Sequence, residues 1–323
     1  MIFRPLGSTK IDVSVLGFGC WQLGGKGWGT FSLREVVIAL QEAFTAGINL
    51  FDTAPVYGLG RSEELLGRTV AAHQECVIVS KGGLVWDAAG RIGHDARPES
   101  LRTQLTASLR RLRRERVDVY LLHWPDPNVP LSESTAALDD LLSEGLVRAW
   151  GLSGHSLSAV RPLLTTGSLP VLELPVNVLD AYSDEFAKLA PDIPPLLAAA
   201  AERDVGVLAF DVLSRGLLPR RTTVEPETFG RRDLRRHDWR FGKRGVETLT
   251  ERRRRLRELA LQQALPAAAL AIRAVSERRG VTAAVVGMKN PAQLRENLRF
   301  VEAELPDELR DWAVADGDGD GTY

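Results

Sequence analysis

The segment Val117-Asp118-Val119-Tyr120-Leu121-Leu122-His123 has the composition of a short strand buried on both faces, because its apolar residues follow one another with little alternation. Seven similar runs occur along the chain, and segments with helical spacing separate them. The runs cover residues 14–19, 49–54, 76–81, 117–123, 148–153, 172–177, 205–210 and 283–288. Eight strands alternating with about eight helices predict an α/β protein of the (β/α)8, or TIM barrel, type.

The segments between the runs support this fold. The one that begins at Pro98 places four leucines between residues 101 and 112 on one stripe, as in an amphipathic helix, and proline suits a first helical turn. The main alternative is a doubly wound open sheet. That alternative is weaker because Gly17-Phe18-Gly19-Cys20-Trp21-Gln22 lacks the third glycine of a dinucleotide-binding fingerprint.

Two segments depart from the alternation of strands and helices. Residues 1–13 contain two short extended stretches around Gly7-Ser8, which predict a β-hairpin that closes the bottom of the barrel. Residues 211–245 are polar and Arg-rich and predict a long loop after strand seven; such loops are usually functional lids or disordered. We expect residues 1–323 to form a single barrel domain, with residues 315–323 as a flexible tail.

Charge and cysteine content exclude several classes of protein. The 323 residues include 41 Lys and Arg against 42 Asp and Glu, so the basic excess that nucleic acids or anionic membranes require is missing. Cys20 and Cys76 cannot make a disulfide framework or a Cys-rich zinc site, and we expect no metal ion. No apolar run approaches the roughly 18 residues of a membrane span. The first residues lack a signal-peptide stretch, and we expect a soluble cytoplasmic protein.

Polar side chains stand where the second, third and fourth strands end. Asp52 closes the second, Tyr57 follows five residues later, and Lys81 and His123 close the next two. Taken singly, each has a structural explanation, such as a helix cap, a packing residue, a solvated lysine or a core histidine. Because strand ends meet at one face of a barrel, we expect the four to converge. The walls of a substrate pocket around Tyr57 and His123 would be Trp21, Trp28, Trp86 and Trp124.

Together, these four residues could act as a proton donor. A free tyrosine is a poor acid at neutral pH, since its pKa is about 10. We expect a cationic Lys81 to lower the pKa of Tyr57, and Asp52 to keep Lys81 charged. His123 can orient a substrate oxygen by a hydrogen bond. An acid of this kind suits hydride addition to a carbonyl group, for which a cofactor must supply the hydride.

These residues lie in motifs that resemble the aldo-keto reductases, from residues 16–19 to residues 293–297. The motifs are Phe51-Asp52-Thr53-Ala54, Val56-Tyr57-Gly58, Arg61-Ser62-Glu63-Glu64-Leu65-Leu66-Gly67, Ser80-Lys81-Gly82 and His123-Trp124-Pro125-Asp126. The resemblance implies an NAD(P)H-dependent barrel enzyme in which Tyr57 is the general acid/base, Lys81 and Asp52 tune it, and His123 orients the carbonyl. The chain looks most like the bacterial branch that includes the reductase of inositol-utilisation operons, which shares the long loop after strand seven.

The resemblance also implies cofactor contacts, with some departures. Ser153 is followed by Gly154 where relatives have Asn, Glu173 replaces Gln, and Phe210 replaces a Tyr that stacks on the nicotinamide. Asp211 is unusual beside a phosphate. Lys289 could hold a 2′-phosphate, which favours NADP(H) over NAD(H). The structural alternative is that residues 291–297 merely open the last helix. The remaining implied cofactor contacts are Gly19, Trp21, Asp52, Val212, Leu213, Gly216, Leu217, Gly287, Met288, Gln293, Glu296 and Asn297.

Three functional hypotheses follow. The favoured one is an NADP(H)-dependent oxidoreductase that reduces a small-molecule aldehyde or ketone, such as a sugar or natural-product carbonyl, to an alcohol. The second is a nicotinamide-binding regulatory subunit with little or no turnover, which the unusual Gly154, Glu173 and Asp211 would suit. The third keeps the enzyme but gives it a phosphate-bearing, nucleotide-linked substrate held by the Arg-rich loop. We expect no nucleic-acid or membrane partner, and the sequence does not predict an oligomeric state.

Overall fold

Parallel strands form a closed barrel in the computed structural model, which describes residues 1–71, 73–220, 226 and 228–315. The ring is closed by pairing of the first and eighth barrel strands, in register at Gly17 and Val285. The (β/α)8 prediction is confirmed, and each predicted run overlaps one barrel strand. The strands are β3 (Leu16–Gly19), β4 (Leu50–Asp52), β5 (Val77–Gly82), β8 (Val117–Leu122), β9 (Val147–Ser153), β10 (Val171–Pro175), β11 (Gly206–Phe210) and β12 (Ala283–Gly287).

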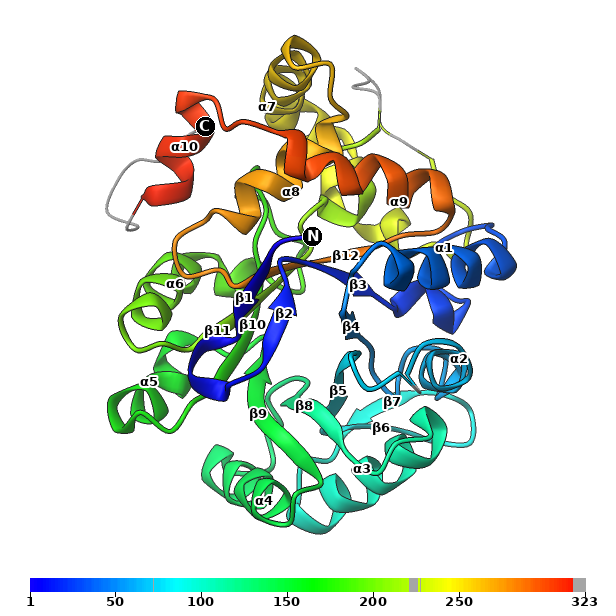
Figure 1. Cartoon of the computed structure of the whole chain (residues 1–323), viewed down its shortest axis with the longest axis vertical. Helices are drawn as coiled ribbons and strands as arrows, with labels where there is room; N and C mark the ends of the chain where they lie inside the picture. The colour runs from blue at the N-terminus through cyan, green and yellow to red at the C-terminus, as the bar shows by residue number, and fades with distance from the viewer. Residues whose placement is uncertain (72, 221–225, 227, 316–323) are drawn as a thin grey trace.

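Helices surround the barrel, and Figure 1 looks along its axis. Eight of them each follow one strand: α1 (Leu33–Thr45), α2 (Arg61–Thr69), α3 (Pro98–Leu112), α4 (Leu131–Ser143), α5 (Leu157–Thr166), α6 (Ile193–Glu202), α8 (Ala267–Ser276) and α9 (Pro291–Leu298). Two more, α7 (Lys243–Gln262) and α10 (Asp307–Val314), are additions to the repeating pattern. The helix predicted from Pro98 buries Leu101, Leu105 and Leu112 against the barrel, as its stripe of leucines requires.

The N-terminal hairpin plugs the end of the barrel away from the strands' carboxyl ends. Its strands β1 (Phe3–Pro5) and β2 (Asp12–Ser14) pair antiparallel, and they lie across the barrel in Figure 1. Leu6 and Ile11, at most 1% exposed, pack in one cluster with inward-facing side chains such as Val119 and Leu208. The hairpin prediction is therefore confirmed, and its apolar turn supplies the floor of the core.

The long loop after β11 is also confirmed over its described part. It contains three short 3-10 segments, Ser214–Gly216, Leu234–His237 and Trp239–Phe241. The backbone N–H of Leu234 donates to the carbonyl oxygen of Gly27 at 3.0 Å, so this loop reaches the loop that follows β3. Residues 221–225 and 227 of the predicted loop, and residues 316–323 of the predicted tail, lie outside the described residues.

A second hairpin follows β5 and was not predicted. Its strands, β6 (Leu84–Trp86) and β7 (Ile92–His94), pair antiparallel around a turn in which Asp87 accepts hydrogen bonds from residues 89 and 91. Strands of three residues are too short for a periodic pattern to be visible in the sequence.

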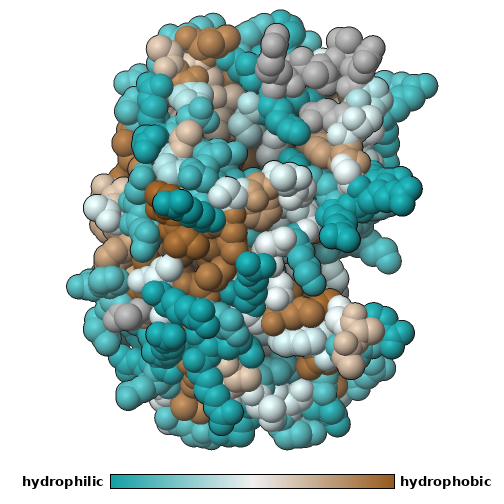
Figure 2. Space-filling view, turned by 90° about the vertical axis from the view of Figure 1, so that its right-hand side faces the viewer, coloured by the Kyte–Doolittle hydropathy of each residue, from teal (hydrophilic) through white to brown (hydrophobic). Residues whose placement is uncertain are grey.

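Polar side chains cover most of the face seen in Figure 2, and the molecule is hollowed at the right-hand edge of that view. Over the described residues, no single helix has the length and apolarity to cross a membrane; α7 and α8 meet that test only as a pair bent by 98°. The same part of the chain contains no cluster of three or more His, Cys, Asp or Glu side chains suited to a metal ion.

Replacement of Leu6 by Ala should destabilise the barrel, because it removes the buried side chain that fills the floor. We expect a loss of about 2–5 kcal/mol in the free energy of unfolding, measured by urea denaturation. The control is Leu261→Ala, because Leu261 is 70% exposed on α7. That variant should change stability by less than about 0.5 kcal/mol; equal effects of the two variants would contradict a core role for the hairpin.

Candidate active site

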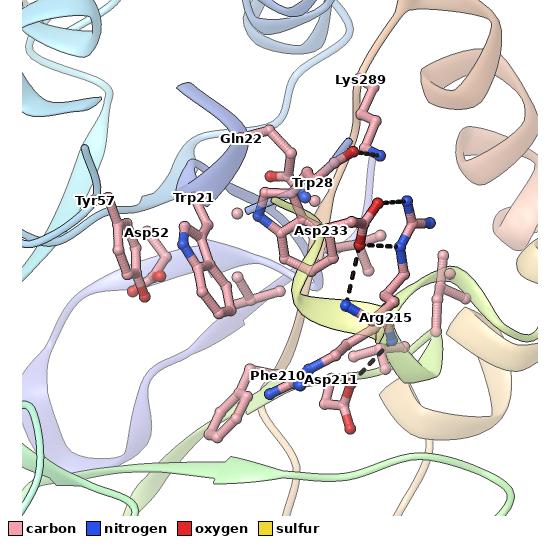
Figure 3. Close-up of a pocket in the computed structure, with 18 of the residues that line it drawn as sticks. Trp21, Gln22, Trp28, Asp52, Tyr57, Phe210, Asp211, Arg215, Asp233 and Lys289 are labelled. Carbon is pink, nitrogen blue, oxygen red and sulfur yellow. Dashed lines mark hydrogen bonds and ion pairs between the residues drawn. The ribbon is translucent and has the colours of Figure 1, made fainter. Parts of the chain in front are cut away.

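A cavity of about 1090 Å³ opens at the carboxyl ends of the barrel strands. It brings together most of the residues that the sequence singled out. Tyr57 and Asp52 lie at one end and Lys289 at the other, with Trp21, Trp28 and Phe210 between them (Figure 3). The other expected site residues in its wall are Gly19, His123, Trp124, Ser153, Glu173, Val212, Leu213, Gly216, Gly287, Gln293, Glu296 and Asn297.

Lys81 lies beneath the cavity wall and is 1% exposed. Its ammonium donates a hydrogen bond to Asp52 Oδ2 and another to the backbone oxygen of Thr53 at 3.2 Å. A second carboxylate, Glu173 Oε1, lies 3.3 Å from Lys81 Nζ. The other oxygen of Glu173 accepts a hydrogen bond from Ser153 Oγ at 2.6 Å. One buried ammonium thus joins the ends of β4, β5 and β10.

Tyr57 is surrounded by this ammonium and by two rings. Lys81 Nζ lies 5.5 Å from the centroid of the phenol ring. The His123 ring stands nearly perpendicular to Tyr57 at a centroid distance of 5.8 Å, and Trp21 stacks on Tyr57 at 5.6 Å. The four residues expected to form a proton donor therefore converge, on the side of the cavity formed by β4, β5 and β8.

Burial dominates the electrostatics of this cluster. Burial alone would lower the pKa of Lys81, but the charges of Asp52 and Glu173 outweigh it and raise that pKa, so Lys81 is charged at neutral pH. Burial, together with the charge of Glu173, raises the pKa of Asp52 to about 8. Burial and then the Lys81 ammonium lower the pKa of His123 well below its usual value, so its imidazole is neutral.

The expected net decrease in the pKa of Tyr57 is wrong for the cavity as it stands. Lys81 does favour the phenolate, but burial has the larger effect and raises the pKa of Tyr57. Two carboxylates already compensate the ammonium, and both of them oppose ionisation of the phenol. Tyr57 is therefore fully protonated at neutral pH, and the Lys81 ammonium is the cation that lies close to its phenolate once the proton is lost.

A close backbone contact holds the Tyr57 loop in place. Gly58 has φ +68°, and a Cβ atom there would lie 2.3 Å from the carbonyl oxygen of Gly24. Only glycine allows this backbone to approach the loop after β3 so closely. The contact places Tyr57 beside Trp21, the aromatic side chain on which it stacks.

The motif after Tyr57 anchors α2 to the strands. Ser62 Oγ donates to the carbonyl oxygen of Cys20 at 2.8 Å. Glu63 is fully buried; it accepts hydrogen bonds from Ser80 Oγ on β5 and Arg111 Nε on α3, both at 2.6 Å. The buried Glu63 carboxylate thus links α2, β5 and α3 directly behind Lys81.

Asp211 does not present an uncompensated charge to the cavity. Its Oδ2 accepts a hydrogen bond at 2.6 Å from Arg240 Nη1, and the Arg240 side chain is 0% exposed. Arg240 also donates to Asp238 at 2.7 Å. Arg215, in turn, pairs with Glu185 at 2.7 Å. Arg240 and Arg215 are therefore both used in ion pairs within the protein.

Three expected contacts lie outside the cavity wall. Met288 and Leu217 are at most 1% exposed and pack in the apolar layer between barrel and helices. Trp86 is paired with Ile92 in the hairpin of β6 and β7, but it is not part of the wall. Leu84, Ile92 and His94 of this hairpin form the wall instead.

The wall also contains residues that the sequence analysis did not select. Phe186 and Phe229 line the cavity, as do Asp233 and Arg235. Arg235 forms two hydrogen bonds with Asp233, at 2.9 and 2.6 Å. All four lie in irregular segments, where no periodicity indicates which side chains turn inward; the Arg-rich composition was the one available signal.

A family model described as the aldo/keto reductase family matches residues 15–311. The chain belongs to the aldo/keto reductase family. As a member it is an oxidoreductase acting on carbonyl and alcohol groups, as the motifs implied.

Individual relatives support this assignment over nearly the whole chain. Aldo-keto reductase YhdN of Bacillus subtilis is 29% identical, over 91% of this chain and 87% of that protein. The NADH-specific methylglyoxal reductase of Escherichia coli is 28% identical, over 94% of both. Among solved structures, the glycerol dehydrogenase AKR11B4 from Gluconobacter oxydans matches with a TM-score of 0.80 and 32% identity, over 96% of this chain and 92% of that one.

Members of this family use nicotinamide cofactors, and the cavity fits one. Two buried polar atoms there, Gln22 Oε1 and Trp28 Nε1, have no hydrogen-bond partner among the described residues. Unpaired buried polar atoms are costly in a folded protein and are usually satisfied by a ligand or water.

Replacement of Arg240 by Met should destabilise the protein, because it leaves the carboxylates of Asp211 and Asp238 buried without their main partner. We expect a loss of about 3–5 kcal/mol in the free energy of unfolding, measured by urea denaturation at pH 7. The matched control is Arg236→Met on the exposed side of the same loop, expected to cost less than about 0.5 kcal/mol. Similar stabilities for the two variants would argue against Arg240 as the anchor of the loop.

Proposed function

We propose that this protein reduces small aldehydes or ketones to alcohols with NADP(H), using Tyr57 as the general acid. The observation that carries the proposal is the meeting of Tyr57, a buried Lys81 ammonium and a neutral His123 at the wall of one cavity. This complete set of proton-transfer groups favours turnover over the alternative of a regulatory subunit. The names of two relatives, a methylglyoxal reductase and a glycerol dehydrogenase, support small polar substrates.

Each group has a defined part in the proposed reaction. When bound, the reduced nicotinamide supplies the hydride that the carbonyl carbon receives. His123, being neutral, donates a hydrogen bond to the carbonyl oxygen and orients it. Tyr57 transfers its phenolic proton to that oxygen as negative charge develops there. Lys81 stabilises the phenolate that remains, and Asp52 keeps Lys81 charged and in place.

Different parts of the cavity wall would contact the cofactor and the substrate. Trp21, Trp28 and Trp124 would exclude water from the carbonyl group. Ser153 and Glu173 would hold the nicotinamide carboxamide, and Phe210 would lie against its ring. Val212, Leu213 and Gly216, which line the cavity, would lie beside the pyrophosphate, while Gln293 and Asn297 would contact the adenosine.

Replacement of Tyr57 by Phe should reduce carbonyl reduction at least 10²-fold, the lower end of what a general acid contributes. Cofactor affinity should stay within about threefold, because the phenol lies at one end of the cavity. Turnover is followed by NADPH absorbance over a panel of small aldehydes and ketones, and binding by NADPH fluorescence. Tyr120→Phe, a change at a buried tyrosine of β8 outside the wall, is the control and should keep its activity. Full activity of the Tyr57 variant would end the proposal.

The preference for NADP(H) rests on Lys289 at the far end of the cavity. Its ammonium donates to the backbone oxygen of Trp28 at 2.9 Å, and burial and then nearby Arg235 lower the pKa of Lys289 to about 8. Lys289 is therefore mostly charged at pH 7 and can attract a 2′-phosphate. Above pH 8 the unbound side chain loses its charge, so selectivity for NADPH over NADH should fall as the pH rises from 7 to 9.

Lys289→Met should lower the affinity for NADPH about tenfold and leave that for NADH within about twofold, since only NADPH has the extra phosphate. The pH dependence of selectivity should disappear in the same variant. Dissociation constants from fluorescence titrations at pH 7 and 9 measure both effects. Equal affinity of the wild-type protein for the two cofactors, or tighter binding of NADH, would contradict the preference for NADP(H); the methylglyoxal reductase relative is NADH-specific.

A further inference from the structure

Glu173 adds a second buried carboxylate to a site that needs only one to hold its ammonium. The residue is 3% exposed, lies in β10 and lines the cavity. One oxygen is 3.3 Å from Lys81 Nζ, and the other accepts from Ser153 Oγ. Asp52 already forms the shorter ion pair with the same ammonium. The Lys81 ammonium thus holds Glu173 in place, although Asp52 already pairs with the same ammonium.

The charges that face Glu173 make the site net negative when Asp52 and Glu173 are both ionised. The neighbours in register on β9 and β11 are Ser153 and Leu208, which are uncharged. Tyr57 and His123 are neutral at pH 7. The remaining charged groups are Asp52 at the end of β4 and Lys81 on β5. With both carboxylates ionised, two negative charges oppose one positive charge.

We propose that Glu173 makes this cavity select the oxidised, cationic form of the nicotinamide over the reduced, neutral form. The inference rests on the proposed function, because it takes the cavity as the nicotinamide site. A fixed carboxylate in the wall attracts a ring with one positive charge and has no net charge to attract in the reduced ring. The attraction is strong there because burial keeps water, which would screen it, away from the wall.

The same charge alters the energetics of the reaction. In carbonyl reduction the cofactor loses two electrons and one proton as a hydride to the carbonyl carbon, and the Tyr57 proton goes to the carbonyl oxygen. The nicotinamide gains its positive charge in that step. A wall that stabilises the cationic form therefore makes the bound reduced cofactor a stronger hydride donor. The oxidised cofactor should also dissociate more slowly than the reduced cofactor.

The preference should depend on pH. Because the pKa of Asp52 is raised to about 8, Asp52 keeps its proton below pH 8, and a single carboxylate then faces the Lys81 ammonium. Above pH 8 that proton is lost and the site becomes negative. Affinity for the oxidised cofactor should therefore rise as the pH increases through about 8, relative to affinity for the reduced form.

The test measures binding rather than turnover. Dissociation constants for NADP⁺ and NADPH are determined by calorimetry at pH 6.5 and pH 9 for the wild-type protein, Glu173→Gln and the matched control Glu296→Gln. Both cofactor forms have the same 2′-phosphate, so effects at Lys289 cancel in the ratio of the two constants. Glu296 also lines the cavity but lies on α9 rather than on a barrel strand.

Glu173→Gln should raise the ratio of the NADP⁺ constant to the NADPH constant by about tenfold or more at pH 9. It should also remove the pH dependence of the ratio, whereas Glu296→Gln should leave the ratio unchanged. A ratio that does not move in Glu173→Gln, or moves the other way, overturns the inference. If that variant does not fold, the wild-type pH series decides, and a flat ratio overturns it. Failure of the wild-type protein to bind either form would instead contradict the proposed function.

Discussion

The structure of the site depends on one buried ammonium held between two carboxylates. Lys81 on β5 contacts Asp52 on the neighbouring strand β4 and Glu173 on β10, across the barrel. Removal of Lys81 would leave two carboxylates buried without a cation, which costs several kcal/mol. The cluster therefore fixes the strand ends relative to one another, and Tyr57 and His123 take their positions against it. Structural and chemical requirements thus coincide in the same three side chains.

The loop after β11 follows the same physical principle at the opposite side of the cavity. Its anchor is Arg240, which is buried with Asp211 and Asp238. Apolar packing would hold such a loop in several nearly equivalent ways, but a guanidinium that must satisfy two carboxylates accepts few arrangements. Asp211, which looked unfavourable beside a phosphate site, is one half of this anchor. An apparent departure from the family pattern is thus compensated within the chain itself.

Much of this architecture could be predicted from the sequence, for reasons that particular residues illustrate. Parallel strands buried on both faces leave apolar runs such as residues 117–122, and the polar residues that close those runs must meet at one face. What could not be predicted depends on distances between segments far apart in the chain. The pairing of Glu173 with Lys81, and the burial that raises rather than lowers the pKa of Tyr57, follow from how strands sit around the ring. Trp86 was misplaced because the short hairpin that carries it leaves no periodic signal.

The buried bridge between Glu63 and Arg111 has a consequence for how relatives of this protein can diverge. The two residues belong to different helices and lie 48 positions apart, yet each is the other's charge partner. A lineage that lost one of them first would pass through a less stable intermediate, since an uncompensated charge would stay inside. Substitutions at Glu63 and Arg111 should therefore occur together, so that relatives keep both charges or replace both with apolar side chains. This pair therefore restricts how the packing of α2 against α3 can change during evolution.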